Sequence, residues 1–159
     1  MGKGVIMNRE ILFKAKRKDN GKWVEGYYIY HIKRTICPLG DSVKSEDEQH
    51  VIMQDGFSDW NMPRNTVVYE IDPDTLCQFT GLTDKNGEKI WENDICDRKE
   101  KYPEIVTYNK GDWQLDYSYV FGKEMHTDAC NLGFYVCERD CVEVIGNIFD
   151  NVDLLEAKQ

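Results

Sequence analysis

Short β-prone runs separated by turn residues are the feature that most constrains how this chain can fold. Two Asn-Gly pairs, Asn20-Gly21 and Asn86-Gly87, each stand between runs of apolar and aromatic residues. This dipeptide is the strongest short-range signal for a β-hairpin, because both residues accept the positive φ of a tight turn. The sequence therefore predicts a hairpin around each pair, and the first one joins a strand at 10–15 to a strand at 22–30.

Runs of the same kind continue along the chain, and in its second half they recur about every ten residues, which is typical of a small barrel or sandwich. We expect further strands at 35–37, 50–54, 66–71, 77–80, 94–97, 104–108, 112–117, 133–136 and 142–149. Only 72–76 and 151–157 have helical character, and strands and helices do not alternate, which excludes a doubly wound fold. The predicted fold class is mainly β, with small barrel-like or sandwich-like lobes and one or two short helical turns.

The chain has 159 residues, of which 41% are apolar, and this is enough to bury one core without disulfides. We predict a single domain over 7–155, preceded by an N-terminal arm at 1–6. Division into two β lobes, at about 7–71 and 77–150, is the alternative. No apolar run approaches the roughly 18–20 residues of a membrane span, and no secretion signal is recognised. We therefore expect a cytoplasmic protein with reduced thiols and no membrane partner.

The charge balance disfavours binding to nucleic acid. There are 29 acidic residues against 20 basic ones, a net charge of −9, whereas contact with a phosphate backbone draws on clustered Lys and Arg. The densest basic run contains Lys14, Lys16, Arg17 and Lys18. A small β-barrel that binds nucleic acid through this run remains an alternative hypothesis.

The six cysteines fall into two groups. Cys37, Cys77 and Cys96 stand singly in apolar stretches, where we expect buried thiols. The other three join a histidine in a set of four zinc-ligand types within sixteen residues, His126, Cys130, Cys137 and Cys141. The paired spacing of a structural zinc knuckle is missing, so zinc remains a hypothesis beside a core-and-loop interpretation of these residues. No other cofactor is expected.

Enzymatic chemistry has little support in the sequence. The nucleophile elbow, the phosphate-binding loop and the dinucleotide fingerprint do not occur, and the three histidines are scattered. One alternative is a metal-dependent hydrolase built on five neighbouring carboxylates, Asp72, Asp74, Asp84, Glu92 and Asp94. Turn formation explains Asp84-x-Asn86-Gly87 better, since tight turns select these residue types. We therefore expect no catalytic residues.

One irregular segment, 56–63, concentrates large apolar side chains outside the predicted strands. It contains Phe57, Trp60 and Met62. Such a cluster is typical of a patch that binds a partner or a second copy, and it is equally typical of a loop folded over a small satellite core. The other tryptophans, Trp23, Trp91 and Trp113, lie in predicted strands, where burial is expected.

The string Gln78-Phe79-Thr80-Gly81-Leu82-Thr83-Asp84-Lys85-Asn86-Gly87-Glu88-Lys89-Ile90-Trp91-Glu92-Asn93-Asp94-Ile95 resembles the signature of the YopX family of phage and prophage proteins. The opening hairpin from Phe13 to Gly26, the segment Pro73-Asp74-Thr75 and the strand Val144-Ile145-Gly146-Asn147 resemble further parts of the family pattern. In this sequence Asn93 stands where the family usually has glycine, so it must accept a turn conformation that glycine takes more easily. Asn151-Val152 stands where Asn-Pro is common. At Gly146 we expect a bulge or a close backbone approach.

The resemblance implies a mainly β fold and brings no established activity or catalytic residue with it. The leading hypothesis is a non-enzymatic accessory protein of a phage or prophage, in the cytoplasm of the bacterial host. It would bind a protein partner that the sequence does not identify, with Phe57, Trp60 and Met62 as the contact, and form a homo-oligomer.

Overall fold

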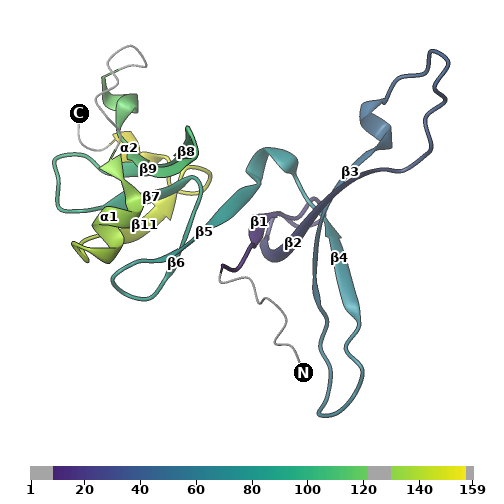
Figure 1. Ribbon diagram of the computed structural model, residues 1–159, viewed down its shortest axis with the longest axis horizontal. Helices are drawn as coiled ribbons and strands as arrows, with labels where there is room; N and C mark the ends of the chain where they lie inside the picture. The colour runs from purple at the N-terminus through teal and green to yellow at the C-terminus, as the bar shows by residue number, and fades with distance from the viewer. Residues whose placement is uncertain (1–8, 122–129, 157–159) are drawn as a thin grey trace, which may run out of the picture. The chain divides into compact units, whose positions relative to one another are not determined.

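The computed structural model describes residues 9–121 and 130–156, and over these residues the chain is mainly β, as predicted (Figure 1). Its strands are β1 (Phe13–Lys16), β2 (Trp23–Ile32), β3 (Glu48–Asp55), β4 (Thr66–Glu70), β5 (Cys77–Thr83), β6 (Lys89–Trp91), β7 (Asp94–Asp97), β8 (Glu104–Asn109), β9 (Asp112–Asp116), β10 (Cys130–Asn131) and β11 (Glu143–Asn147). The helices are α1 (Leu132–Cys137) and α2 (Asp153–Glu156), with 3₁₀ turns at Ser45–Asp47, Pro73–Thr75 and Ser118–Val120.

The strands form two antiparallel sheets, with the orders β4-β3-β2-β1-β5-β6 and β10-β9-β8-β7-β11. Over the described residues neither sheet closes into a barrel. In the first sheet an isolated antiparallel bridge joins Arg17, which follows β1, to Ile71, which follows β4. Beside this bridge the Lys18 N–H donates to the Glu70 carbonyl at 3.0 Å. The chain divides into two compact units, which we call the N-terminal unit, Ile11–Gln78, and the C-terminal unit, the described residues from Phe79 onward with Arg9 and Glu10.

The N-terminal unit begins with the predicted hairpin. Strand β1 pairs with β2 from Phe13 opposite Gly26 to Lys16 opposite Trp23, and Gly21 in the turn has a φ of 68°. A Cβ atom on Gly26 would lie 2.3 Å from the Met53 carbonyl oxygen, so β3 can approach β2 this closely only beside glycine. The core of this unit is small and consists of Ala15, Val24, Ile52 and Ile71.

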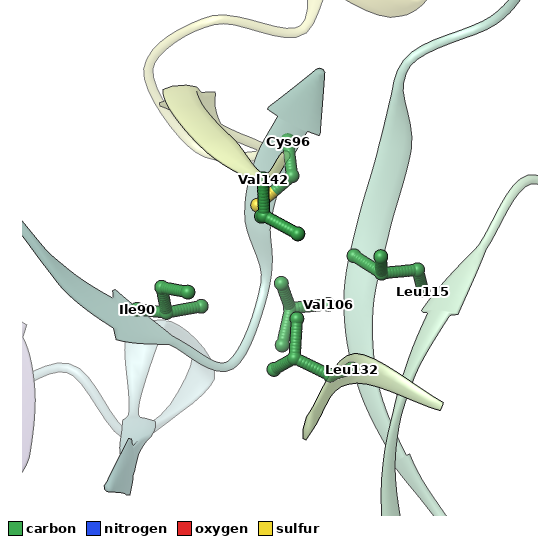
Figure 2. Close-up of a cluster of buried hydrophobic side chains, with 6 residues drawn as sticks. All are labelled: Ile90, Cys96, Val106, Leu115, Leu132 and Val142. Atoms are coloured by element: carbon green, nitrogen blue, oxygen red, sulfur yellow. The ribbon is translucent and has the colours of Figure 1, made fainter. Parts of the chain in front are cut away.

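The C-terminal unit is built around a larger apolar cluster (Figure 2). Six fully buried side chains from different strands, helix α1 and the segment before β11 meet there, namely Ile90, Cys96, Val106, Leu115, Leu132 and Val142. Each of them is at most 1% exposed. Burial raises the pKa of the Cys96 thiol, so this cysteine packs as a small apolar side chain.

The expectation of a strand at 133–136 is wrong, because this segment is helix α1. The Asn131 side chain accepts a hydrogen bond from the Phe134 N–H at 2.7 Å and so caps the helix. Such a cap satisfies one of the N–H groups that a first helical turn leaves without a partner, and it decides against the extended form that Phe, Tyr and Val prefer. The Pro73 turn was predicted correctly, and Asp72 accepts from the Asp74 N–H there.

Two further expectations about the N-terminal half, a strand at 35–37 and a buried Cys37, are wrong for one reason. The segment between β2 and β3 that contains these residues does not pair with another strand in the described part of the chain. Residues 35–37 are not a strand, and Cys37 is exposed, whereas Cys77 and Cys96 are buried as expected. Of the strand tryptophans, Trp91 is buried, while Trp23 and Trp113 are half-buried.

Within the described residues, no helix is both long enough and apolar enough to cross a membrane.

Candidate functional site

The acidic residue at the centre of the signature string, Asp84, ties two distant parts of the C-terminal unit together. Its Oδ1 accepts from the Asn86 N–H at 2.8 Å and the Glu88 N–H at 3.0 Å, and its Oδ2 accepts from the Val144 N–H at 3.0 Å. Burial by itself would raise the pKa of Asp84, but these N–H donors outweigh it and lower the pKa. The carboxylate therefore joins the β5–β6 turn to β11.

The second turn of the string lies between β6 and β7. Buried Asp94 accepts from the Trp91 N–H at 2.8 Å. Asn93 has a φ of 66°, so it adopts the left-handed conformation that its place in the family pattern demands. Its N–H donates to the Val106 carbonyl and its own carbonyl accepts from the Ile148 N–H, which connects the turn to β8 and to the residue after β11.

Gly146 also has a structural role. The pairing of β11 with β7 shifts register between Val144 and Gly146, which is the predicted bulge. A Cβ atom at Gly146 would lie 2.6 Å from Oδ1 of Asn151, and the same oxygen accepts from the Asn147 N–H at 3.2 Å. The signature residues therefore specify turns and strand contacts rather than a reacting centre.

Three of the five carboxylates in the hydrolase alternative accept hydrogen bonds from nearby backbone N–H groups. Asp72 caps the Pro73 turn of the N-terminal unit, and Asp84 and Asp94 accept backbone N–H groups of the C-terminal unit. Over residues 9–121 and 130–156, no three His, Cys, Asp or Glu side chains are grouped as metal ligands would be.

Of the four zinc-ligand candidates, His126 lies outside the described residues. Cys130 accepts a long hydrogen bond from Nη2 of Arg98 at 3.7 Å, and Cys141 contacts the Tyr135 carbonyl at 3.8 Å. Cys137 is exposed at the end of helix α1. The three cysteines on their own make no described metal site, and the set with His126 stays a hypothesis from the sequence.

The basic run has partners within its own unit. Arg17 forms an ion pair with Asp19 and lies over the Tyr69 ring at 4.0 Å, and Lys18 pairs with Glu70 at 2.8 Å. The ammonium groups of Lys14 and Lys16 lie 5.1 and 5.5 Å from the Trp23 ring. The run is therefore a set of cation–π and ion-pair contacts around β1.

The apolar segment predicted as a partner patch is an exposed loop between β3 and β4, and its large apolar side chains are not buried over a satellite core in the described part of the chain. Phe57 is 92% exposed, Trp60 95% and Met62 64%. The Gly56 N–H donates to the Asn65 carbonyl at 2.6 Å, which closes the base of the loop. The Ser58 hydroxyl donates to the Met62 carbonyl at 2.9 Å, and Asn61 has a φ of 61°. Phe57, Trp60 and Met62 are therefore three exposed side chains of one loop, and their role as a partner patch stays a prediction.

The structure also shows a site that sequence reasoning missed, a cavity of about 400 Å³ in the C-terminal unit. At its floor Arg98 donates to buried Glu104 from Nε at 2.5 Å and from Nη2 at 2.6 Å. These hydrogen bonds raise the pKa of Arg98 above the ordinary value of an arginine, so its guanidinium stays charged. The two residues flank the β7–β8 connection, where no motif marks them, so only the pairing of Cys96 with Glu104 brings them together.

A comparison with solved structures finds protein EF1440 from Enterococcus faecalis, which is 22% identical to this chain. The alignment covers 93% of this chain and 99% of that one, with a TM-score of 0.48. No curated protein matches the sequence. A comparison with family models matches residues 12–156 to the family described as YopX protein. Since the match extends over most of the chain and includes the Asp84, Asp94 and Gly146 contacts described above, this protein belongs to the YopX family.

Proposed function

We propose that this protein is a non-enzymatic accessory protein of a phage or prophage that works in the host cytoplasm by binding protein. The hairpin formed by β3, β4 and the loop 56–65 is its binding surface, and a second copy of the chain is the partner that occupies it. The observation that carries the proposal is the exposure of Phe57, Trp60 and Met62 on a loop whose base is closed by hydrogen bonds.

The loop presents apolar area in a fixed form. A fully buried side chain of this size contributes about 1.5–3 kcal/mol relative to an exposed one, so leaving three of them in water forgoes several kcal/mol that association recovers. Since Ser58 and the Gly56–Asn65 hydrogen bond restrain the loop, little conformational entropy is lost when it docks.

The adjacent strand offers a second element of the same surface. β4 is the outer strand of its sheet. Asn65 and Ile71, at the two ends of β4, form hydrogen bonds toward β3. In an antiparallel pair, residues whose N–H and C=O groups point toward the partner strand alternate with residues whose groups point away from it. Thr66 and Val68 therefore turn their N–H and C=O groups away from β3. The carbonyl of Glu70 is already an acceptor for Lys18, which places the open part of the edge at Thr66–Val68.

The composition of this edge favours a second copy as its occupant. Thr66-Val67-Val68 is β-branched throughout, and it has none of the charged residues or prolines that usually prevent a second strand from pairing with an edge. An antiparallel copy of β4 presents the same outward N–H and C=O groups, so pairing of the two strands gives hydrogen-bond partners to both copies. Such an interface has two-fold symmetry and leaves no equivalent edge open for a third copy. The exposed Val68 side chain, 53% accessible, and the loop would then be covered together.

Sedimentation velocity over a concentration series tests the proposal. We expect the wild-type chain to pass from monomer to dimer with rising concentration. Trp60→Ala and Val68→Lys should shift this transition to at least about tenfold higher concentration. Leu39→Ala removes an equally exposed apolar side chain, 91% accessible, from the other long loop of the unit, and should leave the transition unchanged.

A chain that stays monomeric at all concentrations would overturn the choice of a second copy. Dimerisation that neither Trp60→Ala nor Val68→Lys weakens would overturn the choice of surface.

A further inference from the structure

We propose that the cavity beside Arg98 binds a small, neutral, planar ring that carries a carbonyl oxygen, of the size and chemistry of a nucleobase in a nucleoside. The cavity belongs to the C-terminal unit alone, and its volume of about 400 Å³ falls within the range of small-molecule pockets. Its lining comprises Arg98, Glu100, Lys101, Tyr102, Glu104, Tyr117, Phe121 and Cys130.

The walls are aromatic. The rings of Tyr102 and Phe121 pack edge to face, with centroids 6.0 Å apart and an interplanar angle of 89°. The rings of Tyr117 and Phe121 pack in the same way, with centroids 6.2 Å apart and an interplanar angle of 76°. Phe121 is 48% exposed although it belongs to this group, so part of its ring surface is open to contact. A planar ring is the ligand shape that can stack on such a wall.

The floor supplies one directed hydrogen-bond donor. The Arg98 side chain is only 8% exposed, and Glu104, the Cys130 sulfur and the Tyr135 ring, 3.8 Å from the guanidinium carbon, hold it in one orientation. Among the described residues Nη1 has no hydrogen-bond partner. No fully buried polar side-chain atom in this part of the chain is unpaired, so Nη1 is not fully buried. Because Arg98 lines the cavity, Nη1 is a preorganised donor for an oxygen there.

The charges decide between a neutral and an anionic ligand. Glu104 neutralises Arg98 through two hydrogen bonds, and Glu100 balances Lys101, so the charges of the described lining residues sum to zero. The whole chain carries a net charge of −9, which repels anions. A neutral carbonyl therefore suits Nη1 better than a carboxylate or phosphate does.

Calorimetric titration with inosine and adenosine tests this assignment, because the two nucleosides share the ribose and the purine ring and differ at one edge. Inosine has a carbonyl oxygen at position 6 and an N–H at N1, whereas adenosine has an amino group at position 6 and an unprotonated N1. We expect saturable binding of inosine and at least about tenfold weaker binding of adenosine, whose amino group meets the Nη1 donor. Equal binding of the two would overturn the role of Arg98. Failure of inosine to bind at its solubility limit would overturn the site.

Phe121→Ala should weaken inosine binding about tenfold, as loss of a stacking partner does. Tyr108→Ala is the matched control, since Tyr108 is 57% exposed on β8 and does not line the cavity, and it should leave binding within about twofold. Equal effects of the two variants would contradict a site at this cavity. Thermal unfolding of both variants verifies that they fold.

Two further ligands distinguish the source of the ring. A uridine hexamer with one central inosine should bind more weakly than free inosine, because the net charge opposes its phosphates. Tighter, salt-sensitive binding of the hexamer would overturn the assignment to a free nucleoside. Preference for 4-hydroxybenzoate over inosine would overturn the assignment to a neutral ring. Neither result depends on self-association through β3 and β4, so this proposal and the proposed function fail separately.

Discussion

The two units of this protein use their apolar residues differently. The C-terminal unit places six side chains in one cluster that excludes water almost completely. The N-terminal unit has a cluster of four buried side chains and leaves Phe57, Trp60, Met62 and Val68 in contact with solvent. The difference indicates that apolar residues in the C-terminal unit contribute to stability, whereas many of those in the N-terminal unit are available for binding.

The two tryptophans Trp91 and Trp60 test this difference most strongly. Trp91 is 4% exposed and packs against Phe79 with ring centroids 5.3 Å apart, so Trp91→Ala should lower the free energy of unfolding by about 3–5 kcal/mol. Trp60→Ala should change it by less than about 0.5 kcal/mol at concentrations where the chain is monomeric. Urea denaturation followed by circular dichroism measures both. Similar losses would break the comparison between the units.

A polar contact inside the C-terminal unit comes next in expected size. Asp84→Asn keeps the shape of the side chain but turns an amide NH₂ toward an N–H donor, so we expect a loss of about 2–3 kcal/mol in unfolding free energy. Asp59→Asn, in the exposed β3–β4 loop, is the control and should be neutral within about 0.5 kcal/mol. An equal effect at both positions would mean that Asp84 does not connect the β5–β6 turn with β11.

Gly26 in the N-terminal unit and Gly146 in the C-terminal unit each have other atoms where a Cβ would lie. Gly26→Ala would bring a methyl group against the backbone of β3, and Gly146→Ala would bring one against the side chain of Asn151. Side chains move more easily than a strand, so we expect losses of about 3 kcal/mol and about 1–2 kcal/mol, respectively. Gly133→Ala in helix α1, where the nearest atom is 3.4 Å away, should not destabilise the protein. Thermal unfolding of the three variants gives this ranking.

Acid should affect the C-terminal unit through Asp84. Its pKa is lower in the folded chain than the ordinary value of 3.8, so the folded state binds the proton more weakly than the unfolded state does. The resulting stabilisation is complete above about pH 5 and is lost as the pH falls below 3.8 toward the pKa of the folded state. Denaturation midpoints between pH 6 and pH 3 should therefore fall more steeply for the wild type than for Asp84→Asn. Parallel curves would contradict this.

The smallest effect is expected from metal removal. We expect the full chain, purified without added metal, to contain no stoichiometric zinc and to keep its unfolding midpoint in EDTA. Elemental analysis and thermal unfolding measure this. Stoichiometric zinc would instead support the set of His126, Cys130, Cys137 and Cys141, and would add a metal to the stability of the C-terminal unit.

Local chemistry made much of the fold predictable. Asn20-Gly21 and Asn86-Gly87 mark the two hairpins, and Asp72-Pro73 marks the helical turn, because each depends on backbone conformations that these residues favour by themselves. The segment 133–136 was mispredicted because a single Asn131 cap outweighs the β preference of three residues. The exposure of Cys37 could not be predicted, since burial depends on a neighbour that the local sequence does not specify.

The candidate sites show the same division. The sequence by itself determined the turns, the mainly β class and the presence of an apolar loop, because these follow from residue type and short-range order. Only the tertiary structure decided that Phe57, Trp60 and Met62 lie in solvent, that Asp84 meets Val144, and that Arg98 and Glu104 form the floor of a cavity. Each of these depends on which strands become neighbours. Strand pairing joins residues that are far apart along the chain, and the local sequence around each residue does not indicate its partner.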